Sequence, residues 1–322
     1  HHLDKDTTRD EEGEEKKIIK TKKSTLQTEY EVLMSSVDQH SSEVKVFIPE
    51  VVEKCAEDKT KNEYRCLCPH AGQFMCNVIK LMFEIEGEGE VLYRIVSWDS
   101  CPLDGLDQKE PAGPLYSINC HKGLIKYLHL PHCETRTDGE GLTVAHVTGG
   151  NVEIIKPQTI TNTHVVIDVQ GFSLFGLLRA RLFKAHPIEA QVLLFYKELN
   201  GKNSNVSKLH MHLLPGNVPA EEVQKKNECK TYIETSATCE LTPGNKYWPF
   251  TKNTDHEITI QPECEKFRRD YSTNYHPTFE VFFYTKVNKI TLGLLDEREE
   301  EVWSRLVFLK DTEAASPKLD TT

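Results

Sequence analysis

The stretch IKLMFEIEGEGEVLYRIVSW, residues 79–98, decides the fold class of this chain. Its first part places an apolar side chain at every second position, beginning at Ile79 and ending at Ile85. A period of two is typical of a strand that buries one face. The glycine-rich segment 87–90 then predicts a turn, and residues 91–98 return as a second strand. We therefore predict two consecutive strands joined by a turn here.

The same pattern of short strands between glycine, proline and asparagine turns continues along the chain. It predicts an all-β fold. The strands are too many for one ordinary sandwich, so we predict two consecutive β-sandwich subdomains with little helix. One helix is predicted from Pro219 to about Asn227, because proline followed by acidic residues suits a first helical turn. The further predicted strands are 124–130, 143–147, 163–169, 191–197, 209–214, 257–260, 279–285, 290–294 and 302–309.

Composition sets the predicted domain boundaries. Residues 1–45 are rich in Glu, Lys, Asp and Thr and poor in aromatic side chains, which predicts a disordered linker. Residues 46–172 are the predicted first sandwich and residues 173–310 the predicted second. Residues 311–322 are polar again and predict a linker to a further C-terminal domain that is missing from this chain. Because the chain starts at His1 rather than at methionine, we expect an internal fragment of a longer protein.

Charge and hydropathy exclude several classes of partner. The 322 residues carry a formal net charge of −11, and the pI is near 5.7. Without an excess of cations to neutralise phosphates, we expect no nucleic acid and no anionic membrane as partner. No apolar run approaches the roughly 20 residues of a membrane helix. Since no signal-peptide pattern is visible either, we expect a cytoplasmic protein.

The ten cysteines leave two interpretations open. A domain of this size can build its core without disulfides, which favours reduced cysteines in a cytoplasmic protein. An extracellular adhesion sandwich with paired cysteines is the alternative. Side chains alternate along a strand, so Cys66 and Cys68 are expected on one face. The CxxC pairs of zinc or redox motifs do not occur.

Several candidate motifs fail on their chemistry. His129 and His132, and likewise His210 and His212, could be metal pairs, but a metal site needs further converging ligands. We expect these histidines on solvated strand faces or at strand ends. The segment 171–175 differs from the nucleophile elbow G-x-S-x-G, because phenylalanine occupies the second glycine position. We therefore predict neither a metal nor a cofactor.

Four segments between residues 145 and 176 carry a family resemblance by their order and spacing. They are Ala145-His146-Val147, Ile154-Ile155-Lys156-Pro157, His164-Val165-Val166 and Gly171-Phe172-Ser173-Leu174-Phe175-Gly176. Together they resemble the function-to-find domain (FIIND) of NLR-type, CARD-containing inflammasome sensors. The resemblance covers about residues 60 to 310. It extends to Tyr64–Gly72, Gly113–Ile118, Tyr127–His132 and Leu209–Pro215.

The resemblance implies a fold and a self-cleavage reaction. The family has a first sandwich like that of ankyrins and netrin receptors and a second called UPA, which would meet at the Phe172–Ser173 bond. The Ser173 hydroxyl would attack the carbonyl carbon of Phe172, giving an ester by an N-to-O acyl shift that water then hydrolyses. His146 matches the general base of the family, and an imidazole titrates near neutral pH.

This sequence departs from the family at two positions. The family has a glutamate two residues before the proline that matches Pro157, whereas this chain has Ile155 there. Glu153 lies two residues earlier, on the same strand face, and is the candidate replacement. The family usually has histidine or serine before the phenylalanine, whereas this chain has Gly171. Both departures favour an alternative function, a non-cleaving β-sandwich scaffold for protein–protein interaction.

The resemblance also implies partners. The two cleaved halves would stay associated until the upstream half is degraded. The downstream half would then recruit an inflammatory caspase, through a CARD absent from this chain, and trigger pyroptosis. A cytosolic dipeptidyl peptidase is a further partner that the resemblance implies.

Overall fold

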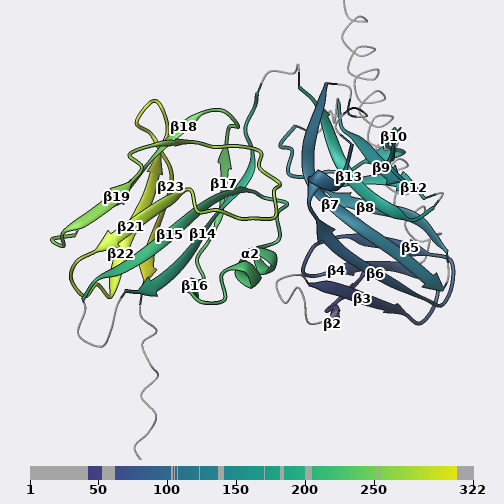
Figure 1. Ribbon diagram of the computed structural model, residues 1–322, viewed down its shortest axis with the longest axis horizontal. Coiled ribbons are helices and arrows are strands. Elements are labelled where there is room, and N and C mark those ends of the chain that lie inside the picture. The colour runs from purple at the N-terminus through teal and green to yellow at the C-terminus, as the bar shows by residue number, and fades with distance from the viewer. Residues whose placement is uncertain are drawn as a thin grey trace, which may run out of the picture. The chain divides into compact units, whose positions relative to one another are not determined.

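The computed structural model describes residues 43–52, 62–102, 104, 106, 108–122, 124–136, 141–169, 171–181, 185–199, 205–252 and 254–309. The predicted linkers at residues 1–45 and 311–322 lie outside this part, apart from residues 43–45. Contacts between residues divide the chain after Lys45, so that Val46–Thr322 form one compact unit. Strands dominate this unit, which confirms the predicted all-β class (Figure 1).

The first sandwich consists of two sheets with a shared apolar core. One sheet has six strands in the order β1-β4-β5-β8-β12-β11, and the other has seven in the order β10-β9-β13-β7-β6-β3-β2. The side chains of Phe83, Tyr93, Tyr116 and Phe175 are fully buried between them. The strands are β1 (Lys45–Phe47), β2 (Glu50–Val52), β3 (Glu63–Cys68), β4 (Gly72–Cys76), β5 (Met82–Ile85), β6 (Gly89–Val96), β7 (Lys109–Lys122), β8 (Ile125–Pro131), β9 (Thr143–Thr148), β10 (Asn151–Ile155), β11 (Thr159–Ile160), β12 (His164–Asp168) and β13 (Ser173–Ala180).

The second sandwich follows with its own core. Its larger sheet has the order β16-β14-β15-β21-β19, with β17 pairing to β14, and its smaller sheet has the order β20-β18-β22-β23. Met211, Phe279 and Leu292 are fully buried in the core between the sheets. The strands are β14 (Ile188–Glu198), β15 (Ser207–Pro215), β16 (Thr231–Ile233), β17 (Thr238–Leu241), β18 (Lys246–Lys252), β19 (Ile258–Gln261), β20 (Glu265–Lys266), β21 (Phe279–Phe283), β22 (Lys289–Leu295) and β23 (Glu301–Phe308).

Most predicted elements are confirmed, with bounds that shift by a few residues. The predicted helix is α2 (Ala220–Lys226), and Pro219 stands at its N-cap. The two consecutive strands that decide the fold class lie in different sheets, because β5 pairs with β4 and β8, whereas β6 pairs with β3 and β7. Strand β6 alternates strictly between buried and half-buried residues. Strand β5 starts at Met82, three residues later than the apolar pattern. The delay has a local cause, since Lys80 has a φ of 62° and extended backbone can begin only after it.

The expected solvent exposure of His210 and His212 is wrong. Both faces of β15 are buried, and the exposed fraction of the His212 side chain is zero. The outer face of the larger sheet carries a second apolar cluster, in which Phe195 packs with Val223 of α2 and with Tyr271. Burial lowers the pKa of His212 to about 3, so its imidazole is neutral and serves as a core side chain.

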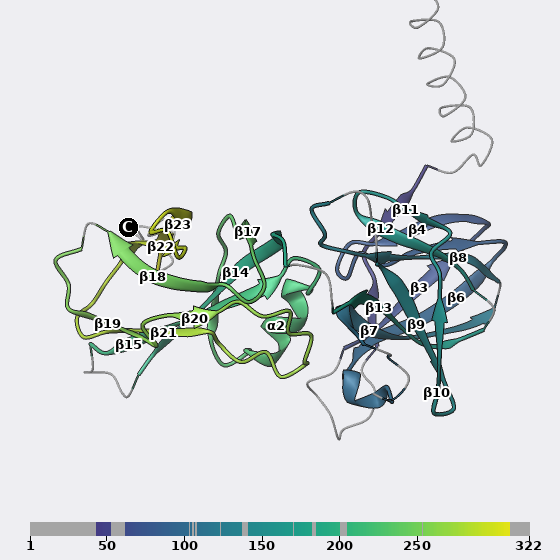
Figure 2. The same ribbon diagram turned by 90° about the horizontal axis from the view of Figure 1, so that it is seen from above.

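The structure differs from the predicted boundary between the sandwiches at Phe172–Ser173. Strand β13 begins at Ser173 and pairs with both β7 and β9 in the seven-stranded sheet of the first sandwich (Figure 2). Its residues Phe175 and Leu177 are buried in that core. The first sandwich therefore extends to Ala180, and the second begins with β14.

Gly176 in β13 allows close packing of a tryptophan. A Cβ atom at this position would lie 2.5 Å from both Cη2 and Cζ2 of Trp98. The indole cannot easily retreat, because its Nε1–H donates a hydrogen bond of 2.9 Å to the carbonyl oxygen of Gly113. We therefore expect Gly176→Ala to lower the free energy of unfolding by about 1–3 kcal/mol, as overpacking does.

Chemical denaturation measures this effect, and Gly87→Ala is the matched control. No atom lies within 4 Å of a Cβ added at Gly87, so this change should leave the free energy of unfolding nearly unaltered. Equal stability of the two variants would contradict the close packing of Trp98 on Gly176.

Candidate functional site

A tight hairpin brings His146 and Glu153 together. Strands β9 and β10 are joined by Gly149 and Gly150, whose φ angles of 52° and 85° suit the two central positions of a hairpin turn. In the resulting register, Glu153 lies directly opposite His146. The Nδ1 atom of His146 lies 3.8 Å from Oε2 of Glu153, which is longer than a hydrogen bond but close enough for charge attraction. Glu153, the candidate replacement for the family glutamate, thus lies next to His146.

The other neighbour of β9 is β13, and it brings the Phe172–Ser173 junction beside His146. Phe175 is the register partner of His146. The two rings stack with centroids 4.4 Å apart and an interplanar angle of 4°. A Cβ atom added at Gly171 would lie 4.0 Å from Cε1 of the imidazole. His146 therefore lies beside the segment that contains the junction, and a side chain at position 171 would contact the imidazole without a clash.

The imidazole of His146 is in the state that a general base requires. Its side chain is buried, and among the described residues its Nε2 atom has no hydrogen-bond partner. Burial lowers the pKa of His146, and the carboxylate of Glu153 opposes this only in part. The ring is therefore neutral at pH 7. With the proton on Nδ1, facing Glu153, the lone pair of Nε2 is free to accept a proton.

Phe172 and Ser173 stand where the chain enters the sheet. Phe172 is half-buried and packs against the first core, which fixes the acyl side of the bond. Ser173 is the first residue of β13, pairs with Ile118 of β7, and remains half-buried. A hydroxyl, a neutral imidazole and a carboxylate thus come from adjacent strands. This set can activate an alcohol beside a peptide bond. The roles of Ser173, His146 and Glu153 stay predictions.

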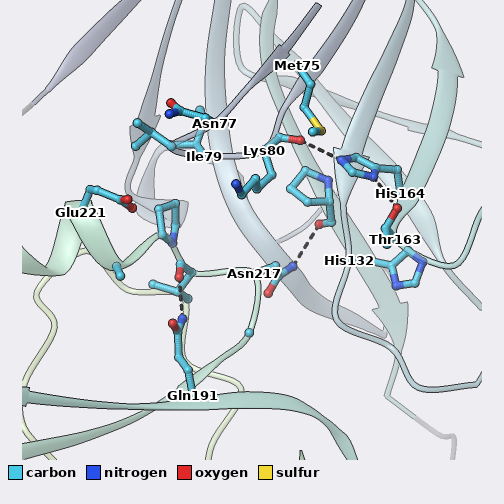
Figure 3. A pocket seen from close by; sticks show the side chains of 16 residues that line it. Met75, Asn77, Ile79, Lys80, His132, Thr163, His164, Gln191, Asn217 and Glu221 are labelled. Atoms are coloured by element: carbon cyan, nitrogen blue, oxygen red, sulfur yellow. Dashed lines mark hydrogen bonds between the residues drawn. The ribbon is translucent and has the colours of Figure 1, made fainter. Parts of the chain in front are cut away.

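Contacts across the two sandwiches join residues upstream of the junction to residues downstream of it. The hydroxyl of Tyr64 donates a hydrogen bond of 2.6 Å to Oε1 of Glu222, a residue of α2. The side-chain Nδ2 of Asn217 donates a hydrogen bond of 3.1 Å to the carbonyl oxygen of Pro131 (Figure 3). It donates a second bond, also of 3.1 Å, to the carbonyl oxygen of Ala112. A cavity of about 530 Å³ beside Asn217 is lined by residues of both parts, among them Lys80 (Figure 3).

A buried ion pair is a further contact of this kind. Glu134, just after β8, accepts hydrogen bonds of 2.6 and 3.0 Å from the two terminal nitrogens of Arg269. His186 approaches the same carboxylate at 3.1 Å. Burial by itself raises the pKa of Glu134, but the bonds from Arg269 and His186 hold it below its ordinary value. Sequence reasoning missed this group, because its members are distant in the chain and carry no motif.

The other candidate residues form no metal centre. The described part of the chain contains no group of three or more His, Cys, Asp or Glu side chains that could hold a metal ion. Cys66 and Cys68 lie on one face as expected, with sulfur atoms 3.3 Å apart, and no disulfide joins two of the nine described cysteines. Among the described helices, none is long and apolar enough to cross a membrane.

Fold and site together define a protein of two β-sandwiches with a histidine–glutamate pair beside a Phe-Ser junction. Comparison with known families matches residues 57–185 to the family described as "Function to find", abbreviated FIIND. It matches residues 188–307 to the UPA-FIIND domain. The chain therefore belongs to the FIIND family and carries both parts of that domain.

The curated relatives are much longer than this chain. The chain is 26% identical over 278 residues to "NACHT, LRR and PYD domains-containing protein 1b allele 3" of Mus musculus, which covers 81% of this chain and 23% of that protein. It is 23% identical over 280 residues to "NACHT, LRR and PYD domains-containing protein 1a allele 1" of Rattus norvegicus, which covers 81% of this chain and 22% of the relative. The chain thus spans less than a quarter of these relatives.

Proposed function

We propose that this chain is the self-cleaving regulatory module of an inflammasome sensor and breaks its own backbone between Phe172 and Ser173. The observation that carries the proposal is the neutral, buried imidazole of His146, whose Nε2 lacks a partner among the described residues and whose ring lies beside Gly171. Membership of the FIIND family agrees with it.

The reaction is an N-to-O acyl shift followed by hydrolysis. The hydroxyl oxygen of Ser173 attacks the carbonyl carbon of Phe172 while His146 accepts the hydroxyl proton. The C–N bond then breaks, the proton passes to the amide nitrogen, and an ester joins Phe172 to the Ser173 side chain. Water hydrolyses the ester, leaving a carboxylate on Phe172 and a free amine on Ser173.

The energetic demand on this site is small because the event happens once per chain. A half-time of hours corresponds to an activation barrier of about 23 kcal/mol. The nucleophile is covalently tethered to its target, and well-oriented intramolecular attack reaches effective concentrations of about 10⁵–10⁸ M. A single general base with a weakly coupled carboxylate is therefore sufficient, and no substrate pocket is needed.

Cleavage would leave the halves associated, because β13 belongs to the downstream half but sits between β7 and β9 of the upstream half. Arg179 of β13 also pairs with Glu110 of β7 at 2.6 Å. We propose that degradation of the upstream half in the cytoplasm frees the downstream half. In the intact sensor this half would carry the caspase-recruiting domain. A dipeptidyl peptidase that binds the module would restrain this step.

A denaturing gel tests the proposal. The purified chain is incubated at 37 °C and sampled over a day, and the smaller product is sequenced from its amino end. The proposal requires a sequence that begins Ser173-Leu174-Phe175. A single intact band throughout the incubation would instead support the non-cleaving scaffold, and a different new amino end would place the reaction elsewhere.

The pH dependence of cleavage should report the titration of His146. The base must be neutral, and burial lowers its pKa, so the rate should be constant above about pH 6.5, the ordinary histidine value. It should fall at more acidic pH, where the imidazole becomes protonated. Glu153→Gln removes the charge that raises this pKa, so the acid limb should move to lower pH. Since the Glu153 side chain is 75% exposed, the move should be small.

The fraction of cleaved chain, measured on gels from pH 5 to pH 8, gives both profiles. His146→Gln is the control and should remove cleavage over the whole range. A wild-type rate that keeps rising between pH 7 and pH 8 would contradict a base with a lowered pKa.

A further inference from the structure

The ring of Phe175 packs face to face with the imidazole of His146. The two residues are register partners on β13 and β9, and their rings stack with centroids 4.4 Å apart and an interplanar angle of 4°. The other aromatic ring pairs of the described residues have interplanar angles of 27° or more. This close parallel stacking is therefore particular to the candidate base and its neighbour.

Phe175 is itself held firmly in place. Its side chain is 1% exposed and belongs to the apolar core of the first sandwich. Strand β13 is paired on both edges, with β7 and with β9, so its backbone is fixed on both sides. Turning the imidazole of His146 out of its plane would drive it into the phenyl face, which a closely packed interior resists. Phe175 thus fixes the plane of the base.

The plane of the base matters because of where Ser173 lies. Ser173 and Phe175 are two positions apart in β13, so their side chains point to the same face of the sheet. His146 lies opposite Phe175, which makes Ser173 its diagonal neighbour across the two strands. Diagonal neighbours are about 7–8 Å apart, within reach of a long side chain. A ring that rotated freely would rarely direct Nε2 at the hydroxyl, so a fixed plane favours proton transfer.

The carboxylate beside His146 gives the ring little orientation. Position 155, where the family has its glutamate, is Ile155, and Oε2 of Glu153 lies 3.8 Å from Nδ1 on a side chain that is 75% exposed. Among the described residues, Glu153 is the charged group that acts on the ring, and Nε2 has no partner. An exposed carboxylate beyond hydrogen-bond distance constrains a ring only weakly. The stacked ring of Phe175 is the contact that remains to orient it.

The phenyl face also favours the charged form of His146. The face of an aromatic ring carries partial negative charge, which attracts a cation placed over it. When His146 accepts the proton of Ser173, its imidazole becomes a cation stacked on that face. The attraction is larger away from water, and the side chains of His146 and Phe175 are both buried. Because the imidazole is neutral before the reaction, this stabilisation is gained in the transition state and accelerates cleavage.

We propose that Phe175 is a positioning residue for self-cleavage, which holds the His146 imidazole in its plane and stabilises the imidazolium. This proposal rests on the proposed function, because it assigns a role within the same reaction. The proton moves from the Ser173 hydroxyl to Nε2 of His146 and then to the amide nitrogen as the C–N bond breaks. Phe175 itself forms and breaks no bond.

Leucine variants of the full chain test the effect on rate. Phe175→Leu keeps an apolar side chain but removes the aromatic face, and cleavage is followed on denaturing gels at pH 7.5. Phe83→Leu is the matched control, because Phe83 is fully buried in the same core but its ring pairs with Tyr93 at 5.1 Å. Phe175→Leu should slow cleavage about three- to thirtyfold, the range expected for a cation over an aromatic face. Phe83→Leu should stay within about twofold of the wild type.

The titration of His146 separates this role from a general loosening of the core. It is followed by NMR in the Ser173→Ala chain, which stays intact, and the signal is identified by its absence in His146→Gln. Adding Phe175→Leu should lower the pKa of His146, because the imidazolium loses the phenyl face. A loss of packing alone would admit water and raise this pKa, because burial is what lowers it. Adding Phe83→Leu should leave it unchanged.

The possible outcomes distinguish the two proposals. A wild-type chain that stays intact would contradict the proposed function. Cleavage of the wild type with equal rates for the two leucine variants would overturn only the role of Phe175. A pKa of His146 that rises or stays the same in the Phe175→Leu chain would overturn it as well.

Discussion

A Ser173→Ala chain should remain a single polypeptide of 36.9 kDa during an incubation that cleaves the wild type completely. The wild-type mass divides in proportion to length, with 172 and 150 of the 322 residues, into fragments of about 20 and about 17 kDa. We expect cleavage to be abolished, because the methyl group of alanine offers no lone pair to attack the Phe172 carbonyl. Gel electrophoresis under denaturing conditions measures it.

Two features make this prediction specific. Ser173 is half-buried at the first position of β13, so replacing its hydroxyl by hydrogen should leave the fold intact. Ser173→Cys retains a nucleophile at the same atom position and should still be cleaved, which separates the loss of chemistry from a loss of structure. Two fragments from the alanine chain would show that another group attacks the bond, and the proposed mechanism would then be wrong.

The second large effect is expected from Arg269→Ala. The side chains of Arg269 and Glu134 are only 5% and 7% exposed, and their two hydrogen bonds are short. Removing the guanidinium leaves the carboxylate of Glu134 buried with His186 as its remaining close partner. Breaking one partner of such a buried pair costs about 3–5 kcal/mol. We expect the free energy of unfolding of the Ser173→Ala chain to fall by this amount, measured by chemical denaturation.

The neighbouring residue supplies the control. Arg268 is 72% exposed, and its closest carboxylate contact, with Glu265, is 3.9 Å long. Arg268→Ala should therefore change the free energy of unfolding by less than about 1 kcal/mol, as exposed pairs do. In the cleaved wild type, Glu134 and Arg269 belong to different halves, so Arg269→Ala should also make the halves separate at lower denaturant concentration. Similar values for the two arginine variants would contradict a strong contribution of the buried pair.

Local patterns in the sequence predicted much of the fold. The alternation of apolar residues located most strands, and proline before acids located α2. Strand β7 escaped this reasoning, because Pro111, Gly113 and Pro114 interrupt its pattern. The burial of His210 and His212 could not be predicted either. It depends on α2 and on Tyr271, which cover the second face of β15 and lie far away in the sequence.

The sequence could predict only those parts of the candidate site whose residues lie close together in the chain. The spacing of His146 and Glu153 around a two-glycine turn brings them opposite each other, so a hairpin register could be inferred from the sequence alone. The membership of β13 in the first sandwich depends on its pairing with β7, more than fifty positions upstream. The Glu134–Arg269 pair and the stacking of His146 on Phe175 also join residues that are distant in the sequence. They could therefore not be predicted from local patterns.

The position of β13 between two upstream strands determines when the downstream half could be released. An unfolding machine that advances from the amino end meets β7 (Lys109–Lys122) before β9 (Thr143–Thr148). After β7 is removed, residues 174–178 of β13 remain paired with β9 on the other edge. Degradation of the upstream half that stops between residues 122 and 143 would therefore leave the downstream half bound to β9. Under the proposed function, release of the downstream half would require degradation of nearly the whole upstream half, so an occasional proteolytic cut within the upstream half would not free it.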